Sequence, residues 1–443
     1  MRKGCLGRQC VDGERKSGHS LFYPTSSGLP NWVEVFGQRH LCGFVGFFVN
    51  ECLIMCFVTF ASSRPNIGLM ATLLSSAPTY RGAGIHQYSQ HLLAQLPRQA
   101  ARFDYHAFLM DRTYAPPAGV QAHRAGIMPA FPPARILWEQ ARAAWLSRRL
   151  HLDLLHGFAY ALPLTVSIPT VVTVHDLTFQ LFPETFPKSK RIYLSKITAQ
   201  SCRKAAVVIA DSRATANDLQ RLLHIPASKI KVIYIGVDER YRPLPEPDVE
   251  AYRLHKGLPD RFILMIGTLE PRKNHLGLLE AYARYRKIAR QPLPLLIGGG
   301  KGWYFHTIFQ RVQALGLEDA CHFLGFVPWE DLPWLYNAAT LFVYPSHYEG
   351  FGLPVAEAMR CGAPVITSAS SSLPEVAGNA ALTVDPDDHH ALAAAMLLLL
   401  EKEPGRLPEM SERGKLQSLR FQWTQTAAQT AAVYADVLNG SHD

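Results

Sequence analysis

The sequence predicts an α/β fold with two parallel sheets, each flanked by helices, and three observations lead to this prediction. From residue 66 onward, short apolar runs alternate with segments of helical spacing. These runs fall into two groups, separated by a polar linker that Pro243, Pro245 and Pro247 stiffen. The chain has 443 residues, of which 48% are hydrophobic and 18% charged, so it can bury a large core and is not a disordered polypeptide.

The elements follow in order along the chain. Apolar runs predict six strands before the linker and six after it, at residues 66–74, 105–110, 153–156, 170–174, 206–210 and 230–234, then 262–267, 294–298, 322–325, 340–344, 364–367 and 381–384. Segments 198–203 and 276–284 have helical spacing, and a last helix is expected at residues 423–438. We expect domains at residues 64–242 and 243–443, with the last helix packed back on the first domain.

Charge and cysteine content exclude several classes of protein. The net charge of +9 is uneven, because residues 64–240 carry +11 and residues 241–443 carry −4. The basic side chains form no nucleic-acid-binding motif, so we expect no nucleic-acid partner. Five of the eight cysteines lie in the first 56 residues, which indicates a reduced, cytoplasmic body rather than a disulfide framework. No apolar run reaches the length that a polytopic membrane protein needs.

Residues 1–63 differ from the rest of the chain and are expected to lie outside the fold. Their apolar stretch, residues 41–61, is nearly long enough to span a bilayer, but Asn50 and Glu51 stand at its centre. Two interpretations remain: an upstream extension, with Met55 as a later candidate for the start of translation, or a single membrane anchor. Sequencing the N-terminus of the native protein would separate them.

The strongest motif is SHYEGFGLPVAE, residues 346–357, directly after a predicted strand. Gly350 and Gly352 allow a ligand to approach the backbone, and Pro354 suits the first turn of a helix. Free N–H groups at that helix start can hold a diphosphate. Glu349 then lies in the loop and Glu357 on the helix, although a tight turn with two solvated acids would show the same pattern.

A second motif, GTLEPRKN at residues 267–274, follows another predicted strand and carries Arg272 and Lys273. Arginine binds phosphate through two hydrogen bonds and lysine supplies a point charge. The pair therefore favours an anion site, with a solvated surface pair as the alternative.

Two motifs of the first half also follow predicted strands. Gly82 and Gly84 open a helix that can meet a phosphate, but Gln87 stands where a dinucleotide fingerprint has its last glycine. His175 can bond a sugar hydroxyl or be a buried core histidine, and Asp176 beside it can orient it or cap a helix. Ser212 suits a helix N-cap.

Asp385, Asp387 and Asp388 match the D-x-D string of some metal-dependent transferases. They begin a predicted helix, where acids act as caps, so we expect no metal site there.

The stretch SHYEGFGLPVAEAM resembles the E-x7-E signature of the GT-B-fold retaining glycosyltransferases of family 4, especially the mannosyltransferase-like branch. The resemblance runs from about residue 66 to 438. It implies a GT-B fold, in which two Rossmann-like domains face each other across a cleft. It also implies that Glu349 and His175 contact the donor sugar, that Arg272 and Lys273 bind the leaving diphosphate, and that Glu357 holds the ribose. Other implied donor contacts are Gly82, Gly84, Val327 and the loop residues Gly350, Phe351, Gly352 and Leu353.

The expected function is therefore transfer of a sugar, with mannose favoured, from a nucleoside-diphosphate sugar to an acceptor hydroxyl in cell-surface polysaccharide or glycolipid synthesis. GDP-mannose is the favoured donor and UDP-sugars come next; no cofactor and no metal are expected. The acceptor is a glycan or a lipid-linked sugar. The basic domain fits a cytoplasmic enzyme in peripheral contact with the anionic inner face of the plasma membrane. The alternatives are a nucleotide-sugar epimerase or hydrolase of the same fold and a non-catalytic sugar-nucleotide-binding relative.

Overall fold

The structure, a computed structural model, describes residues 44–49, 52–57, 64–74, 83–125, 132–302 and 304–440. The chain divides into two compact units, Met1–Ser63 and Arg64–Asp443. In the first, strands β1 (Phe44–Val49) and β2 (Cys52–Phe57) form an antiparallel hairpin within the apolar stretch 41–61. The other residues of that stretch lie outside the described part. Among the described residues, no helix is long and apolar enough to cross a membrane.

The N-terminal half of the second unit is built on a parallel sheet of seven described strands, in the order β5-β4-β3-β6-β7-β8-β9. Its strands are β3 (Asn66–Met70), β4 (Asp104–Leu109), β5 (Val120–Arg124), β6 (Leu154–Gly157), β7 (Thr170–Val174), β8 (Val207–Ala210) and β9 (Ile230–Val232). The six strands predicted before the linker are all present. Strand β5 was not predicted, because it is an edge strand whose Gln121 and His123 interrupt any apolar run.

The C-terminal half has a second parallel sheet, with six described strands in the order β12-β11-β10-β13-β14-β15. Its strands are β10 (Ile263–Ile266), β11 (Leu295–Gly298), β12 (Cys321–Gly325), β13 (Leu341–Tyr344), β14 (Val365–Ser368) and β15 (Leu382–Val384). Each matches a predicted strand. In both sheets the chain order reverses at the centre, so that ligands are expected beyond the carboxyl ends of the strands there.

Helices connect the strands of both halves. In the N-terminal half they are α1 (Ala83–Gln99), α2 (Pro132–Leu137), η2 (Trp138–Arg142), α3 (Ala143–Arg149), α4 (Thr178–Leu181), η3 (Pro183–Thr185), α5 (Lys188–Lys204), α6 (Arg213–Leu223) and η4 (Ala227–Lys229). In the C-terminal half they are α7 (Glu246–His255), η5 (Pro271–Lys273), α8 (His275–Ile288), α9 (His306–Ala314), α10 (Leu332–Ala338), α11 (Leu353–Cys361), α12 (Leu373–Ala377), α13 (His389–Leu397), η6 (Leu398–Lys402), α14 (Arg406–Ser418) and α15 (Trp423–Leu438).

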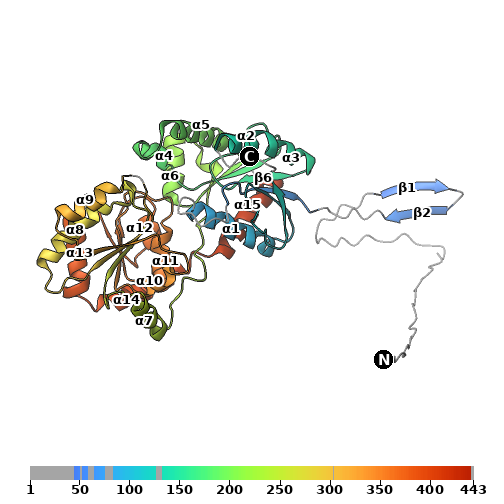
Figure 1. The fold of residues 1–443 in the computed structure, drawn as a ribbon. Coiled ribbons are helices and arrows are strands. Elements are labelled where there is room, and N and C mark those ends of the chain that lie inside the picture. The colour runs from blue at the N-terminus through green and yellow to red at the C-terminus, as the bar shows by residue number, and fades with distance from the viewer. Residues whose placement is uncertain are drawn as a thin grey trace, which may run out of the picture. The chain divides into compact units, whose positions relative to one another are not determined.

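Both faces of the C-terminal sheet are covered, as Figure 1 shows. Alternate residues of β10 belong to two buried clusters, because successive side chains of a strand point to opposite faces. Ile263 and Met265 pack with α8, α9 and α13, whereas Leu264 and Ile266 pack with α10, α11 and α12. The strand is apolar throughout, as is typical of a parallel sheet buried on both sides.

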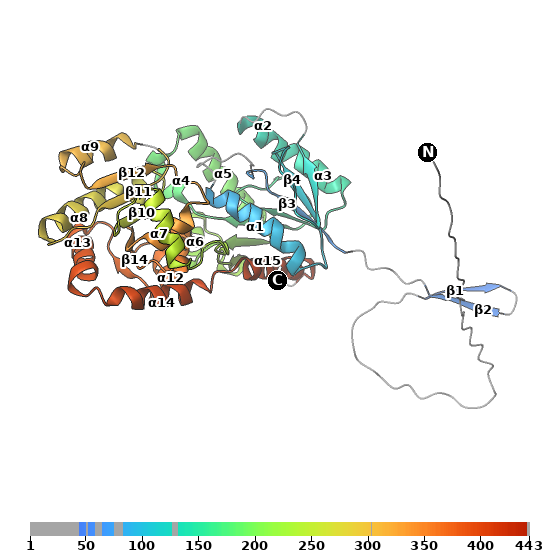
Figure 2. The same ribbon diagram turned by 60° about the horizontal axis from the view of Figure 1, so that its bottom comes forward.

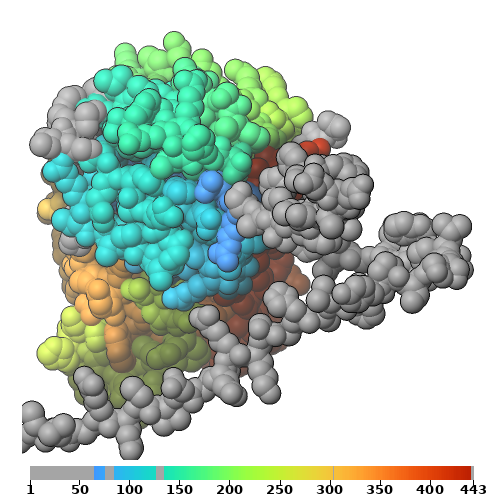
Figure 3. Space-filling model, turned by 90° about the vertical axis from the view of Figure 1, so that its right-hand side faces the viewer, coloured from blue at the N-terminus to red at the C-terminus, as the bar shows by residue number. Residues whose placement is uncertain are grey.

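The last helix, α15, follows the C-terminal sheet in sequence but lies against α1 of the N-terminal half (Figures 2 and 3). The Tyr434 hydroxyl lies 2.7 Å from Nδ1 of the buried His156, and Thr426 donates a hydrogen bond to the Tyr234 carbonyl. Buried residues of both halves form one continuous cluster that includes Trp423 and Tyr434. Helix α15 thus ties the end of the chain to the first sheet.

Candidate active site

Glu349 lies in the loop between β13 and α11, beyond the carboxyl end of a central strand of the C-terminal sheet. Two serines at the start of the α12 segment hold its backbone. The Glu349 N–H donates to Ser371 Oγ at 2.8 Å, and Ser372 Oγ donates to the Glu349 carbonyl at 2.9 Å. Because the side chain is only 9% exposed, its carboxylate needs partners inside the protein.

Those partners come from the next strand of the sheet. Helix η5 follows β10, which pairs with β13, and it carries Arg272 and Lys273. Lys273 Nζ donates to Glu349 Oε1 at 2.6 Å, and Arg272 Nη1 donates to Oε2 at 2.9 Å. Oε1 also accepts bonds from Tyr344 and Ser346, at 2.9 and 2.7 Å. The structure therefore brings together three charged residues that the sequence singled out in two separate motifs.

The charges of this cluster stabilise one another. Burial opposes ionisation of Glu349, but Arg272 and Lys273 outweigh it and lower the pKa of that carboxyl to about 2. Burial and repulsion from Arg272 lower the pKa of Lys273, and the attraction of Glu349 and Glu270 opposes that shift. Glu349 is thus a carboxylate at neutral pH.

The two cations keep hydrogen-bond donors beyond those that the ion pairs use. Arg272 donates to the Tyr348 carbonyl, Glu349 and Glu270 through three of its five N–H groups. Lys273 donates to Tyr344 and Glu349 through two of its three. The cluster can therefore bind an anion such as a diphosphate without losing its internal bonds.

Glu357 lies in α11, two turns after the start of that helix, and is 5% exposed. Gly352 precedes the helix with φ +105°, a conformation that a residue with a Cβ rarely adopts. Tyr336 donates to Glu357 Oε2 at 3.1 Å. Burial raises the pKa of Glu357 to about 7, although Tyr336 favours the carboxylate. The pKa values of the two glutamates of the signature are thus shifted in opposite directions, because among the described residues Glu349 has cationic partners within hydrogen-bond distance and Glu357 has none.

His175 follows β7 in the N-terminal half, and both of its ring nitrogens are bonded to the protein. Nδ1 lies 2.6 Å from Asp211 Oδ2, and Nε2 lies 2.8 Å from the Phe158 carbonyl. Burial opposes protonation, but Asp211 outweighs it and raises the pKa of His175. In this arrangement the side chain is held as a buried core histidine, one of the two alternatives that the sequence left open. A contact of His175 with a sugar stays a prediction.

The loop of Glu349 also contacts the N-terminal half. Thr215 Oγ1 lies 3.3 Å from the His175 carbonyl and 3.2 Å from the Gly350 carbonyl, so one hydroxyl links the two segments. Tyr348 donates to Asp218 at 2.9 Å, and the Leu177 N–H lies 3.3 Å from the Tyr348 hydroxyl. The signature loop therefore lies directly against the segment that follows β7.

Two family models match consecutive parts of the chain. "Glycosyltransferase Family 4" matches residues 82–241, and "Glycosyl transferases group 1" matches residues 251–417. The chain is 37% identical over 297 residues to the O-antigen chain mannosyltransferase B of Escherichia coli, covering 66% of this chain and 77% of that protein. It belongs to the family 4 glycosyltransferases.

Two further similarities agree with that assignment. The glycosyltransferase is 31% identical over 296 residues to the serotype-specific mannosyltransferase WbdA of Escherichia coli, covering 63% of this chain but only 36% of WbdA. The solved structure of a sucrose-phosphate synthase from Thermosynechococcus elongatus is similar in fold, with a TM-score of 0.68 at 23% identity over 85% of this chain and all of that one. The GT-B fold expected from the sequence is confirmed.

The remaining predicted donor contacts of the glycosyltransferase are spread over three regions. Gly82 lies outside the described residues, and Gly84, in the first turn of α1, is exposed. Phe351 is buried and packs edge-on against Phe421, with ring centroids 5.2 Å apart. Leu353 and Val327 are partly buried. The side chains of Phe351, Leu353 and Val327 thus pack in the protein, and the predicted donor contacts of all five residues stay predictions.

Two helix caps of the glycosyltransferase were predicted and are confirmed. Ser212 is the N-cap of α6 and accepts a bond from the Thr215 N–H. Asp388 is the N-cap of α13 and accepts from the Ala391 N–H. Of the three aspartates at residues 385–388, Asp388 therefore has the capping role expected, whereas Asp385 accepts a local bond from the Asp387 N–H.

Sequence reasoning missed several residues that build the site. Asp211, the partner of His175, directly follows a predicted strand, and that position was its only signal. Glu375 accepts bonds from the Arg213 and Ala214 N–H groups at the start of α6, although 161 or more residues separate them in sequence. Such a contact has no local pattern and becomes visible only when the two halves are placed together.

The raised pKa of Glu357 predicts a pH-dependent effect on stability. The pKa of Glu357 has its ordinary value of 4.5 in the unfolded chain and is about 7 in the folded one. Between pH 4.5 and 7 the folded state therefore binds more protons than the unfolded state. The contribution of Glu357 to the free energy of unfolding therefore falls by about 3 kcal/mol as the pH rises from about 4.5 to 7. Glu357→Gln removes this loss, and we expect the variant to match the wild type at pH 4.5 and to be the more stable at pH 8. Urea unfolding at both pH values measures this; a variant that is less stable at pH 8 would contradict it.

Proposed function

We propose that this glycosyltransferase transfers a mannosyl group from a nucleoside-diphosphate sugar, with GDP-mannose favoured over UDP-sugars, to a hydroxyl of a glycan or lipid-linked acceptor. The observation that carries the proposal is the buried cluster of Glu349, Arg272 and Lys273 at the carboxyl edge of the second sheet. Cations with spare donors at that edge suit a diphosphate leaving group. The mannosyltransferase names of the relatives at 37% and 31% identity support the choice of sugar.

In the proposed reaction, the bond between the anomeric carbon and the diphosphate oxygen breaks, and its electron pair stays on the phosphate. The acceptor oxygen bonds to the anomeric carbon on the same face, so that the configuration is retained, and its proton passes to the leaving phosphate. Arg272 and Lys273 stabilise the developing charge, and Glu349 Oε2, which accepts a single bond from Arg272, has a lone pair for a sugar hydroxyl. Since these cations lie where the diphosphate leaves, we propose that transfer needs no metal ion.

A donor panel tests this proposal. The purified protein is given GDP-mannose, GDP-glucose or UDP-glucose with lipid-linked glycan acceptors, in the presence and absence of EDTA, and the anomeric configuration of the product is read by NMR. We expect transfer from GDP-mannose with retention and without loss in EDTA. A free epimer, donor hydrolysis alone, or binding without nucleotide release would instead favour the epimerase, hydrolase or non-catalytic alternative.

We also propose that the N-terminal half contacts an anionic membrane surface from the cytoplasmic side. Helices α2, η2, α3 and α5 hold ten basic side chains and one acidic one, the buried Glu139. Trp145 is 41% exposed between Arg142 and Arg149, which lie 4.2 and 5.1 Å from its ring centroid. An aromatic ring among arginines is typical of a protein surface that lies at the level of lipid headgroups.

Vesicle binding is expected to depend on salt and on this surface. The full chain should sediment with vesicles that contain phosphatidylglycerol at low ionic strength, and be released at about 0.5 M salt because charges are then screened. Replacing both Arg148 and Arg149 with glutamate should weaken binding, whereas Lys402→Met in the other half should not. Binding that salt leaves unchanged would point instead to the apolar stretch 41–61.

A further inference from the structure

Tyr344 lies between the lysine and the glutamate of the candidate active site. It is the last residue of β13, directly before the signature motif, and its side chain is fully buried. Lys273 Nζ lies 2.7 Å from the Tyr344 hydroxyl oxygen, and that oxygen lies 2.9 Å from Glu349 Oε1. The sequence predicted Tyr344 as part of a buried strand and assigned it no role in the site.

The direction of both hydrogen bonds follows from the chemistry of the three groups. A lysine ammonium only donates, so the Tyr344 oxygen must accept from Lys273. The single hydrogen of the hydroxyl is then left for Glu349 Oε1. Burial and the charge of Glu349 raise the pKa of Tyr344 well above its ordinary value, so this hydrogen stays on the hydroxyl at neutral pH.

Lys273 depends on the Tyr344 hydroxyl more than Glu349 does. The Glu349 carboxylate accepts hydrogen bonds from four side chains, which belong to Lys273, Tyr344, Ser346 and Arg272. It would keep three of these bonds without the tyrosine hydroxyl. Among the described residues, Lys273 donates to Tyr344 and Glu349, and it would keep one of these two bonds. Loss of the hydroxyl therefore affects mainly the lysine.

The stem of Lys273 is packed as well as its head. A Cβ on Gly267 would lie 3.7 Å from Cγ and Cδ of Lys273 and 3.6 Å from a ring carbon of Tyr344, so the glycine backbone lies beside both side chains. The Gly267 N–H is itself bonded to the Gly298 carbonyl of β11 at 2.8 Å. Two of the three N–H groups of the lysine are bonded, and these bonds fix the direction of the third.

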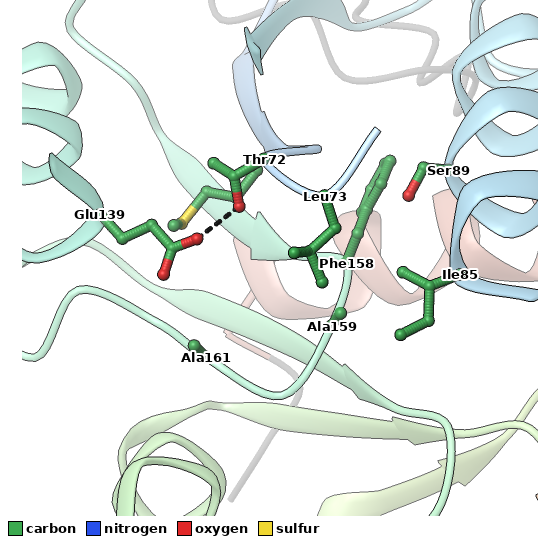
Figure 4. A pocket seen from close by; sticks show the side chains of 9 residues that line it. Thr72, Leu73, Ile85, Ser89, Glu139, Phe158, Ala159 and Ala161 are labelled. Carbon is green, nitrogen blue, oxygen red and sulfur yellow. Dashed lines mark hydrogen bonds between the residues drawn. The ribbon is translucent and has the colours of Figure 1, made fainter. Parts of the chain in front are cut away.

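A buried glutamate of the N-terminal half shows the effect of a hydroxyl partner without a lysine. Thr72 donates to Glu139 Oε1, and Arg135 Nε lies 3.5 Å from the same oxygen. The pocket beside Thr72 and Glu139 has room for about one water molecule (Figure 4). Burial outweighs these partners and raises the pKa of Glu139. One hydroxyl therefore does little to keep a buried carboxylate charged, and the bond to Lys273 is the feature that distinguishes Tyr344.

We propose that Tyr344 is a positioning residue for sugar transfer: its hydroxyl, bonded to Lys273 and Glu349, directs the remaining Lys273 N–H toward the leaving diphosphate. The proposal deepens the proposed function and rests on it for the identity of that anion. Tyr344 takes no part in breaking or forming a bond, because its one hydrogen is already donated to Glu349.

Replacing Tyr344 with phenylalanine removes the hydroxyl and keeps the ring. The charge of Lys273 remains and still attracts the donor, but its N–H loses its fixed direction in the transition state. We therefore expect kcat with GDP-mannose to fall about tenfold and the donor KM to change less than about twofold. Tyr282→Phe is the matched control, because that buried hydroxyl donates to the Leu293 and Ala320 carbonyls at the opposite, amino edge of the same sheet. A kcat of Tyr344→Phe within twofold of the wild type would overturn the proposal.

A double-mutant cycle tests whether Tyr344 acts through Lys273. In a Lys273→Met background there is no ammonium to direct, so adding Tyr344→Phe should lower kcat by less than about twofold. A second tenfold loss in that background would mean that Tyr344 supports the fold or Glu349 instead, and the positioning role would be wrong.

The reactivity of Lys273 separates this proposal from the proposed function. The full chain is treated with a trace of acetic anhydride, and acetylation of Lys273 is measured by peptide mass spectrometry. The Tyr344 oxygen favours the ammonium form, so Tyr344→Phe should lower the pKa of Lys273 and speed its acetylation about tenfold, whereas Tyr282→Phe should not. Unchanged acetylation in Tyr344→Phe would contradict the positioning role. If acetylation is faster in the variant but the wild type transfers no sugar, Tyr344 holds Lys273 and the proposed transfer is wrong.

Discussion

Replacing Lys273 with methionine is expected to lower the rate constant of sugar transfer by a factor of about 10²–10³, the usual cost of removing one group that stabilises developing charge. Methionine has a similar length and no charge, so it keeps the packing of the buried stem. The leaving diphosphate then has Arg272 as its remaining cation in the cluster.

The fold should survive this change because Glu349 retains other partners. Arg272, Tyr344 and Ser346 still donate to its carboxylate, so the variant does not leave an uncompensated buried charge. Loss of Lys273 removes one of the two attractions that lower the pKa of Glu349, and that pKa should rise from about 2.

Steady-state kinetics with GDP-mannose, beside calorimetry with GDP, measures the effect. We expect kcat to fall much more than the donor KM rises, because the charge that Lys273 stabilises develops in the transition state. Lys402→Met, at an exposed position, is the matched control. Turnover of Lys273→Met within tenfold of the wild type would rule out a diphosphate-binding role for this lysine.

Local patterns in the sequence were sufficient for most of the fold, because a strand buried on both faces is an apolar run that needs no context. All twelve predicted strands are present. Among the described strands, three were missed: β5, an edge strand with polar residues, and the hairpin strands β1 and β2 of the apolar stretch 41–61. The motifs also located Glu349, Arg272 and Lys273, since the loops after neighbouring parallel strands meet at one edge of the sheet.

The contacts between distant segments could not be predicted in this way. The sequence shows no link between Glu139 and Thr72, or between Glu375 and the start of α6, because these pairs are separated by 67 residues and by 161 or more. The charge state of each glutamate was likewise unpredictable, since it depends on which partners the fold brings to the buried carboxyl. Glu349 and Glu357 are eight residues apart, yet the pKa of one is lowered to about 2 and that of the other raised to about 7.

Replacing Gly350 with alanine is expected to lower sugar transfer about a hundredfold, the typical cost of displacing catalytic groups by about 1 Å. A Cβ at this position would lie 1.9 Å from the His175 carbonyl oxygen and 3.0 Å from Asp176 Cβ. Real Cβ atoms do not approach a carbonyl so closely, and the oxygen belongs to backbone that cannot rotate away. The segment of Glu349 must therefore move away from the segment of His175.

This movement would break the Thr215 bonds that link the two segments, while each sheet keeps its own core. We therefore expect Gly350→Ala to fold, to bind GDP with little loss, and to transfer sugar slowly. Gly405→Ala is the control, because no atom lies within 4 Å of its Cβ and its φ is −63°. Transfer by Gly350→Ala at the wild-type rate would show that the close approach of Gly350 to His175 is not needed for catalysis. A slow variant with intact GDP binding would instead show that the Arg272 and Lys273 cluster alone is insufficient, and that transfer requires the signature loop to lie against the N-terminal half.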